Sequence, residues 1–295
     1  MRSIKSLLTL AIAGALSTNT YANVLEEVVV TAQKREQNVQ DVGIAVTAMT
    51  GEQLEALGYD NAQDVTAMAA GVSTVQPNGE ANYAIAMRGV AANDFTTNVE
   101  SPVAVYLDEV YISQMSGTGF ALFDMERVEL LKGPQGTLYG RNATGGLAHF
   151  VSVKPSQELE GYAKVTYGDY DQIKFEGAVG GGLTENLSAR LSVSTHDNDG
   201  YIENRLGGDL NNAEDRSYRL QFLWENEATE VLLSLRASDQ DIDTGFFEHV
   251  TSLGAPGELT PELFNSVLGY QDTDGDVFAG DYDDPGYNDL ETRGY

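Results

Sequence analysis

The run DMERVELLKGPQGTLYGRNATGGLAHF fills residues 124–150 and decides how the rest of the chain is organised. Its alternating apolar side chains predict a strand over residues 127–131, and a second apolar strand follows over 147–153. A Gly-Pro turn and a helical or looped patch over 135–142 separate the two strands. Five glycines lie within the run, and each lets the backbone bend sharply or pass close to a neighbour. We therefore expect a compact, strongly bent segment.

A glycine-rich run can also cradle phosphate, but the spacing here argues against a nucleotide loop. The sequence has no Gly-x-x-x-x-Gly-Lys-Ser/Thr, and no Gly-x-Gly-x-x-Gly opens a helix. The run instead resembles the signature that closes the plug domain of TonB-dependent outer-membrane receptors. The resemblance extends over residues 26–155 and implies a small α+β plug domain.

The charge and the cysteine content of the chain limit what it can bind. The formal charge is −28, from 45 acidic and 17 basic side chains. Phosphate binding needs clustered Lys and Arg, so no nucleic-acid partner is expected. The chain has no cysteine, which excludes disulfide bonds and thiolate metal ligands.

Residues 1–22 have the pattern of a secretory signal peptide. Arg2 and Lys5 form the positive start, residues 7–16 the apolar stretch, and residues 20–22 a cleavage site. The alternative is a membrane-tethering helix, but the apolar part is too short to span a bilayer. No later window has the ~18 apolar residues of a transmembrane helix. A membrane-embedded form would therefore have to be a β-barrel.

A short β-prone stretch lies close to the mature N-terminus and resembles the TonB box of the receptor family. A free strand of this kind can add to the sheet edge of another protein. The resemblance therefore implies TonB as a partner that captures this strand. The bland alternative is an ordinary first strand of the plug. The predicted TonB-binding residues are Glu27, Val28, Val29, Val30 and Thr31.

The next region alternates strand and helix. Residues 42–49 are apolar and β-prone. A helix is expected next, with Thr50 as its N-cap and Gly58 at its end. Its side chains Leu54 and Leu57 are expected to face inward. Residues 60–70 predict a second short helix.

Residues 102–112 resemble the strand pair of the plug family. Glu109 occupies the position where that family usually has a turn glycine, so the strands are expected but the type of turn is open.

Three cations of this region have possible roles. The resemblance implies that Arg88 and Lys132 pair with acidic residues on the inner barrel wall. Lysine cannot form the bidentate fork of arginine, so the contact of Lys132 is expected to be weaker. Arg141 also matches the family but has no assigned role. The alternative is that all three are solvated surface residues, whose ion pairs contribute little.

After Pro155 the pattern changes to strict two-residue alternation. Arg190 and Arg219 belong to polar rows that alternate with apolar rows. This alternation is typical of outer-membrane barrels and also of soluble β-sandwiches. The preceding plug resemblance favours the barrel. The expected strands are 160–168, 171–181, 186–196, 216–226 and 229–239.

Connection lengths support the same interpretation. Short turns near residues 183–185 and 226–228 are expected on the periplasmic side, and long loops from 197–215 and after 240 on the outside. The acidic tail contains Asp272, Asp274 and Asp276, which resemble the first half of a calcium loop, but the closing glutamate of an EF-hand is absent. A solvated acidic loop is the simpler interpretation.

Catalysis has no support in the sequence. The three histidines are far apart, and neither a His-x-x-x-His pair nor a Gly-x-Ser-x-Gly elbow occurs. No catalytic residue, resident metal or cofactor is therefore expected.

The combined prediction is an α+β plug domain followed by antiparallel transmembrane β-barrel strands. Five strands cannot close a barrel around a plug, since plugged transporters use 22. We therefore expect the front part of a larger receptor, either a truncated product or a partial sequence. The domains are a signal peptide (1–22), a TonB box with linker (23–40), the plug (41–155) and the first barrel strands (156–295).

The resemblance implies an outer-membrane receptor for energy-coupled uptake of a scarce ligand. Its partners would be TonB, outer-membrane lipid and a small molecule such as a metal chelate, a siderophore or an oligosaccharide. The ligand itself cannot be read from the sequence. One alternative is a binding or adhesion protein that keeps the plug without transport, and another is a secreted β-rich enzyme.

Overall fold

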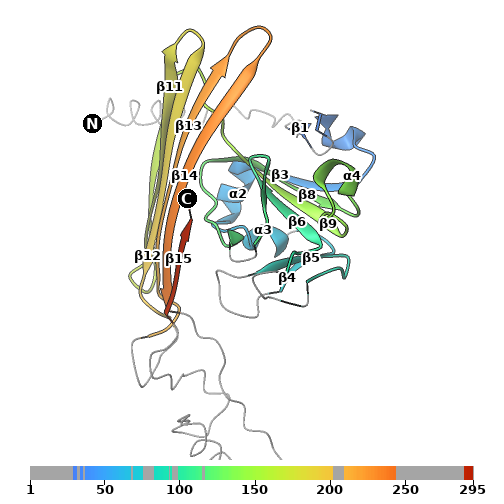
Figure 1. Ribbon diagram of the computed structural model, residues 1–295. Helices are drawn as coiled ribbons and strands as arrows, with labels where there is room; N and C mark the ends of the chain where they lie inside the picture. The colour runs from blue at the N-terminus through green and yellow to red at the C-terminus, as the bar shows by residue number, and fades with distance from the viewer. Residues whose placement is uncertain are drawn as a thin grey trace, which may run out of the picture.

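The computed structural model shows a mixed α/β domain lying beside an extended antiparallel sheet (Figure 1). The described residues up to 153 form the N-terminal domain, and the sheet follows it in the chain. The described residues are 29–31, 34–35, 37–67, 69–75, 83–92, 94, 99–114, 117–201, 209–243 and 289–294.

The N-terminal domain is built on a five-stranded sheet. Its strands, in spatial order, are β3 (Ala45–Thr50), β8 (Met125–Lys132), β9 (Gly146–Ser152), β6 (Val103–Leu107) and β7 (Val110–Ile112). Only β6 and β9 run parallel, and the other neighbours are antiparallel. Every residue of β9 is buried, because strands flank it on both sides and other elements cover both its faces. The two predicted strands of the 124–150 run are therefore confirmed.

Each face of this sheet has its own apolar cluster. Helices α2 (Gly51–Leu57) and α3 (Asp64–Ala67) cover one face and bury residues such as Leu54 and Phe150. Helix α4 (Gly136–Tyr139) and the chain before β3 cover the other face, where Tyr139 packs near Leu147. A two-stranded sheet of β4 (Val72–Val75) and β5 (Ala84–Met87) lies at one end of the domain (Figure 1).

Helix α2 begins and ends as predicted. Thr50 caps it in a capping box with Gln53, and Gly58 follows it with a φ of 70°. Leu54 is buried, but Leu57 is 47% exposed, so the prediction that Leu57 faces inward is wrong. Leu57 lies in the last turn, one residue before the left-handed glycine turns the backbone out of the helix. No helix among the described residues is long and apolar enough to cross a membrane.

The second helix is shorter than the predicted span of 60–70. Of the described residues in this span, 60–67 and 69–70, only Asp64–Ala67 is helical. The Asp64 carboxylate accepts hydrogen bonds from the backbone N–H groups of Asp60 and Asn61, and the Asn61 side chain accepts from those of Gln63 and Asp64. Such local side-chain bonds compete with helix formation, which explains the late start.

Gly146 shows why the central run needs glycine. A Cβ at this position would lie 2.2 Å from the sulfur of Met87 and 2.7 Å from the carbonyl oxygen of Leu131. No side chain fits between these neighbours, so β9 can approach β8 and β5 this closely only with glycine here.

The turn between β6 and β7 takes a left-handed form. Asp108 has a φ of 47° and Glu109 a φ of 68°, the signs that a type I′ turn requires at both central positions. Neither residue is glycine, so the turn carries backbone strain.

The second body is a six-stranded antiparallel meander. Its strands pair in chain order: β10 (Glu160–Tyr167), β11 (Ile173–Thr184), β12 (Leu187–Asn198), β13 (Ala213–Glu225), β14 (Glu230–Asp243) and β15 (Asp289–Gly294). All five predicted strands are confirmed, and the last four extend beyond one or both expected ends. The two short connections join β11 to β12 and β13 to β14, as predicted.

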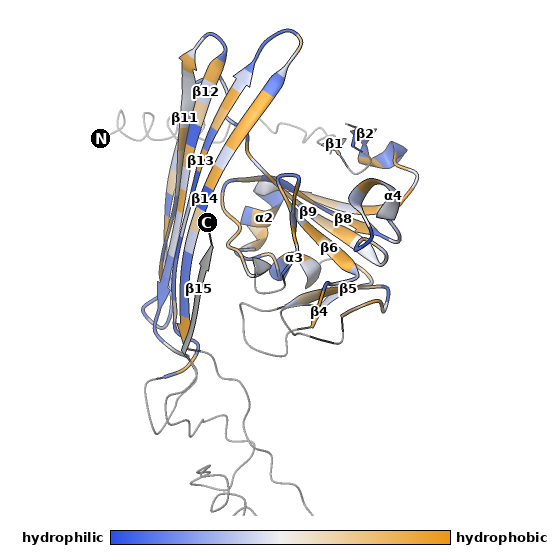
Figure 2. Cartoon of the chain, viewed as in Figure 1, coloured by the Kyte–Doolittle hydropathy of each residue, from blue (hydrophilic) through white to orange (hydrophobic). Residues whose placement is uncertain are grey.

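The two faces of this sheet differ in polarity. Apolar and polar residues alternate along the strands (Figure 2). Leu191, Leu233 and Leu235 are 44–54% exposed, whereas Arg190 and Arg219 are at most 5% exposed. The polar row is thus buried and the apolar row is exposed, the reverse of a water-soluble sandwich.

Candidate functional site

Two contacts among the described residues are candidates for a function. One is the seam between the N-terminal domain and the polar face of the sheet. The other is the contact of the first described residues with the N-terminal domain. The seam holds the body of the domain in place, and the second contact holds the predicted TonB-binding strand.

Asp124 is the centre of the seam. It precedes β8 in a left-handed conformation, with a φ of 51°. Arg190 of β12 donates to both its carboxylate oxygens, at 2.8 and 2.6 Å, and Arg219 of β13 donates at 2.8 Å. Ser192 also donates to this carboxylate. One buried carboxylate thus binds two strands of the sheet through charge-assisted hydrogen bonds.

Arg219 is the deeper of the two arginines, with a relative exposure of 1%. It also donates to the carbonyl oxygens of Phe123 and Asp124, at 3.2 and 2.7 Å, and its guanidinium lies 4.9 Å from the centre of the Phe123 ring. These contacts satisfy much of the guanidinium, which would otherwise be costly to bury.

A second anchor lies at Asp108, in the strained β6–β7 turn. Arg236 of β14 pairs with its carboxylate. The backbone N–H and the hydroxyl of Ser152 donate to it as well, each at 2.7 Å. The anchors at Asp108 and Asp124 together fasten the domain to β12, β13 and β14.

Both anchors favour ionised carboxylates. Burial acts to raise the pKa of Asp124, but the hydrogen bonds from Arg190 and Ser192 and the charge of Arg219 hold this pKa below its usual value. Burial likewise opposes ionisation of Asp108, yet Arg236 and Ser152 lower the pKa of that group. Each aspartate is therefore a negative charge at neutral pH.

More exposed ion pairs surround these anchors. Lys174 of β11 lies 2.5 Å from Asp60, and Lys164 of β10 lies 3.0 Å from Glu55. The partners are largely solvated, so each pair adds little. In both pairs, as at the two anchors, the acid belongs to the N-terminal domain and the cation to the sheet.

A cavity of about 330 Å³ opens along the seam. It is lined by α2, residues 122–125 and strands β10 to β12, and six carboxylates face two cations around it. The cavity is therefore polar and strongly acidic, and it lies directly beside Asp124.

Comparison with known proteins fits this architecture. Residues 38–147 match the family described as TonB-dependent Receptor Plug Domain. The chain is 27% identical over 213 residues to the vitamin B12 transporter BtuB of Vibrio vulnificus, an alignment that covers 68% of this chain and 33% of the transporter. It is 30% identical over 162 residues to the pesticin receptor of Yersinia pestis, covering 54% and 23% of the two chains.

Solved structures show the same arrangement. The ferric yersiniabactin uptake receptor FyuA of Yersinia pestis superposes with a TM-score of 0.60 at 23% identity, over 67% of this chain and 31% of the receptor. A Pseudomonas aeruginosa FpvA structure gives a TM-score of 0.65 at 20% identity, over 79% and 30%. Residues 38–147 belong to the family of TonB-dependent receptor plug domains. The chain spans about a third of the length of these relatives. The N-terminal domain is therefore the plug, and the sheet has the fold of part of a barrel wall.

The predicted TonB-box strand is described in part. Glu27 and Val28 lie outside the described residues. Val29 and Val30 form β1, which pairs with β2 (Gln37–Asn38). Val30 is fully buried against the plug. The structure thus places the end of the predicted strand on the plug surface.

The cations predicted to hold the plug lie away from the anchors. Lys132 donates to the Thr47 hydroxyl at 3.0 Å and to the Ala70 carbonyl at 3.3 Å. Arg88 is exposed with a φ of 52°, and neither residue forms an ion pair within the described part of the chain. Their pairing with a barrel wall stays a prediction. Arg141 pairs with Glu100 of the plug at 2.8 Å.

The aspartate anchors were not predicted from the sequence. The prediction placed the cations on the plug and the acids on the wall, whereas in the observed pairs the acids lie on the plug. One signal was available, because Arg190 and Arg219 stand in the polar rows of two alternating strands. A guanidinium on the inner row of a sheet needs a carboxylate opposite it.

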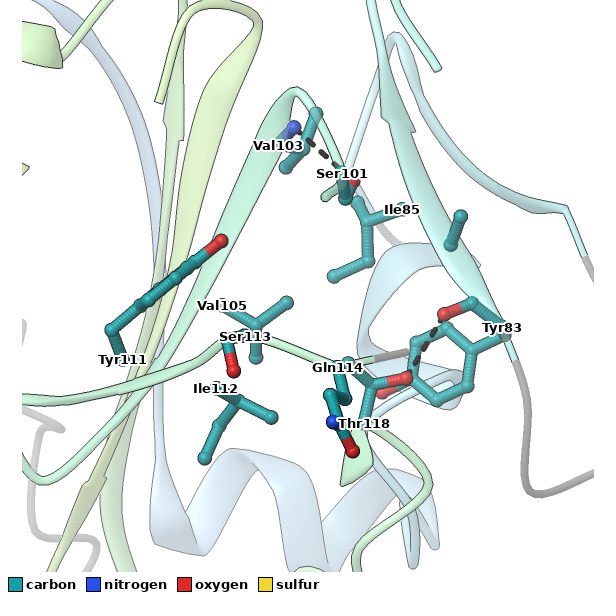
Figure 3. Close-up of a pocket in the computed structure, with 11 residues that line it drawn as sticks. Tyr83, Ile85, Ser101, Val103, Val105, Tyr111, Ile112, Ser113, Gln114 and Thr118 are labelled. Carbon is teal, nitrogen blue, oxygen red and sulfur yellow. Dashed lines mark hydrogen bonds between the residues drawn. The ribbon is translucent and has the colours of Figure 1, made fainter. Parts of the chain in front are cut away.

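A second cavity, of about 10 Å³, lies inside the plug beside Tyr83 (Figure 3). The Thr118 hydroxyl donates to the Tyr83 carbonyl at 2.9 Å, and burial raises the pKa of the Tyr83 phenol. The space holds about one water molecule, which is too little for a ligand. Among the described residues, no group of three or more His, Asp or Glu is arranged to bind a metal. The candidate calcium residues Asp272, Asp274 and Asp276 lie outside that part.

Proposed function

We propose that this chain is the front part of an outer-membrane transporter that takes up a scarce small ligand at the expense of energy delivered by TonB. The observation that carries the proposal is the plug fastened through Asp124 to the polar face of strands whose other face is apolar and exposed. These ion pairs would hold the body of the plug against the wall while force on its N-terminal end opens one part of it.

The polarity of the sheet supports a place in the outer membrane. Its exposed apolar row would face lipid, and its buried polar row faces the plug, as in transmembrane barrels. The short turns would be periplasmic. In Figure 1, β1 lies on the side of the plug toward those turns, and β4 and β5 lie on the opposite side. A TonB-binding strand belongs on the periplasmic side.

We further propose the domain boundaries given by the sequence. Residues 1–22 would be a cleaved signal peptide, 23–40 the TonB box and linker, 41–155 the plug, and 156–295 the start of the wall. The ligand would bind between the plug and the outer loops. Two of the relatives are named for vitamin B12 and ferripyoverdine, which are both metal chelates, and this favours a metal chelate as the ligand class. Arg88 and Lys132 would pair with wall residues of the complete receptor.

The proposed mechanism is strand capture. Ligand binding shifts the plug toward states in which Glu27–Thr31 is free in the periplasm. TonB then adds a strand to this segment and pulls. Partial opening of the plug gives the ligand a path.

The deciding experiment replaces Val29 with proline in the full-length receptor. Proline removes the N–H donor that strand pairing requires. We expect ligand uptake to fall to background while ligand binding to whole cells is unchanged. Val29→Ile, which keeps the donor, is the matched control. Uptake that persists in the proline variant, or that ignores collapse of the proton gradient, would instead favour the binding or adhesion protein.

A further inference from the structure

The first described residues lie on the face of the plug sheet opposite α2 and α3. Val30 is fully buried there, in a cluster with Leu131, Tyr139 and Leu147. The Tyr139 hydroxyl lies 3.4 Å from the Thr31 carbonyl oxygen, to which it donates. Two carboxylates on this face hold the segment at two further points.

Glu129 of β8 makes the first contact. Its side chain is fully buried, and its Oε1 atom accepts from the backbone N–H of Thr31 at 2.8 Å and from the Thr31 hydroxyl at 3.2 Å. Arg127 Nε donates to the same oxygen at 2.7 Å, and Arg127 Nη2 donates to the Thr31 hydroxyl at 3.0 Å. The buried carboxylate thus depends on Thr31 for two of its donors.

Glu109, in the strained β6–β7 turn, makes the second contact. It pairs with the ammonium group of Lys34. The same Nζ atom lies 4.6 Å from the centre of the Tyr139 ring, a cation–π distance. Glu109 keeps its left-handed conformation without being glycine, and such strain persists where the surroundings fix the residue.

His149 lies between the two carboxylates. Its Nε2 is 3.4 Å from Glu109 Oε1, and its Nδ1 is 4.0 Å from Glu129 Oε2. These are the oxygens that the N-terminal segment does not use, because Thr31 bonds to Glu129 Oε1 and Lys34 to Glu109 Oε2. One buried ring therefore faces both contacts without competing with either.

We propose that Glu129 and Glu109 are positioning residues that clasp Thr31 and Lys34 onto the plug and so keep the TonB-binding strand closed. The clasp would have to open before a partner could pair with Val30 and Thr31. The identity of that partner rests on the proposed function, but the clasp itself does not. Glu129 is the stronger point because it is buried and hydrogen-bonded to the backbone, whereas Lys34 and Glu109 are both partly exposed.

The clasp is tested by the accessibility of a single cysteine. The natural chain has none, and Val30 is fully buried against the plug, so Val30→Cys gives one thiol that is shielded while the clasp is closed. Its reaction with a hydrophilic maleimide is followed in the full chain. Glu129→Ala removes the charged acceptor of both Thr31 hydrogen bonds, so we expect labelling to be at least about tenfold faster. Glu126→Ala is the matched control, since Glu126 also pairs with Arg127 but is exposed and makes no contact with Thr31. Its labelling should stay near that of the parent.

The second contact is tested by a double-mutant cycle. Lys34→Gln and Glu109→Gln should each accelerate labelling about two- to fivefold, as expected for an exposed ion pair. The double variant should be no faster than Lys34→Gln alone, because that substitution already breaks the ion pair with Glu109 as well as the contact with Tyr139. Additive effects would show that these two residues do not act on each other.

A folding control keeps the result interpretable. Ala148 is fully buried in β9, so Ala148→Cys in the Glu129→Ala background should stay unlabelled while the plug is folded. If Glu129→Ala unfolds the plug, Thr31→Pro removes the N–H donor from the other side and should give the same acceleration. Parent-like labelling of a folded Glu129→Ala or Thr31→Pro variant would overturn the clasp. Faster labelling combined with no capture by the periplasmic domain of TonB would leave the clasp standing and overturn the proposed function.

Discussion

Asp108 and Glu109 are consecutive residues of one turn, yet their carboxylates fasten the plug to two different segments. Asp108 pairs with Arg236 of the sheet, and Glu109 pairs with Lys34 of the N-terminal segment. Both residues have positive φ. The wall contact and the contact with the predicted TonB-binding segment therefore share one strained turn, and a movement of this turn affects both.

The strain at Glu109 leads to the first prediction. Glycine adopts a φ of 68° without steric strain. Glu109→Gly should therefore raise the free energy of plug unfolding by about 1 kcal/mol. It also removes the partner of Lys34, so the thiol of Val30→Cys should become more accessible. Thermal or urea unfolding and thiol labelling of the same variant measure the two effects. Glu109→Gln, which keeps the strain, should change only the labelling; a destabilised glycine variant would contradict the prediction.

Asp124 gives the second prediction. Asp124→Asn leaves the buried Arg190 and Arg219 without their shared carboxylate, a change that costs about 3–5 kcal/mol. We expect the plug to become sensitive to protease and to unfold at lower urea concentration than the sheet. Glu160→Gln is the comparison, because Glu160 also pairs with Arg190 but is about half exposed. That variant should lose no more than about 1 kcal/mol, and equal losses in the two variants would refute a special role for Asp124.

Acid should weaken the seam, which is the third prediction. The pKa values of Asp124 and Asp108 are lowered in the folded protein, so both groups bind protons less readily than in the unfolded chain. Their contribution is complete above the ordinary aspartate pKa of about 3.9 and is lost as the pH falls below it. Urea unfolding of the plug between pH 2 and 7 should show this loss, and Asp124→Asn should reduce the slope in the acid range.

His149 leads to the fourth prediction, at a higher pH. Burial lowers its pKa; Glu129 and Glu109 raise it, and Arg127 and Lys34 lower it. The rings of Tyr106 and Tyr139 also face it. Opening the clasp exposes the imidazole and removes the Lys34 charge, and both changes raise its pKa. Proton uptake therefore favours the open state.

Labelling of Val30→Cys should accordingly accelerate as the pH falls through and below about 6.5, the ordinary pKa of histidine, once the rate is corrected for the thiolate fraction of a free thiol. His149→Gln has no proton to bind in this range, so its corrected rate should be flat. A His149→Gln variant with the same pH profile as the parent would rule out this histidine as the group that titrates.

The sequence predicted the fold where a local pattern determined it. The strands around Leu130 and Ala148, the cap at Thr50 and the five alternating strands depend on side chains a few residues apart. The helix predicted to start at residue 60 starts only at Asp64, because the side chains of Asn61 and Asp64 bind the local backbone.

The anchors could not be predicted in the same way. Asp124 meets Arg190 and Arg219 across separations of 66 and 95 residues, and no local pattern selects one carboxylate among 45 acidic side chains. Glu129 was part of the quoted run, but it had no assigned role because its partner Thr31 lies 98 residues away. Only the folded topology places these groups next to each other.

The order of the five strands has a mechanical consequence. The N-terminal segment leads directly into β3, and β3 is an edge strand that pairs only with β8. Traction on the N-terminus would therefore first detach the short β1–β2 ribbon and then peel β3 from the side of the sheet. Strands β8, β9, β6 and β7, with Asp124 and Asp108 still bound to the wall, would stay behind. The plug would thus open between β3 and β8. A modest pull would unfold that part, and the remaining strands would stay in place as a template on which it refolds.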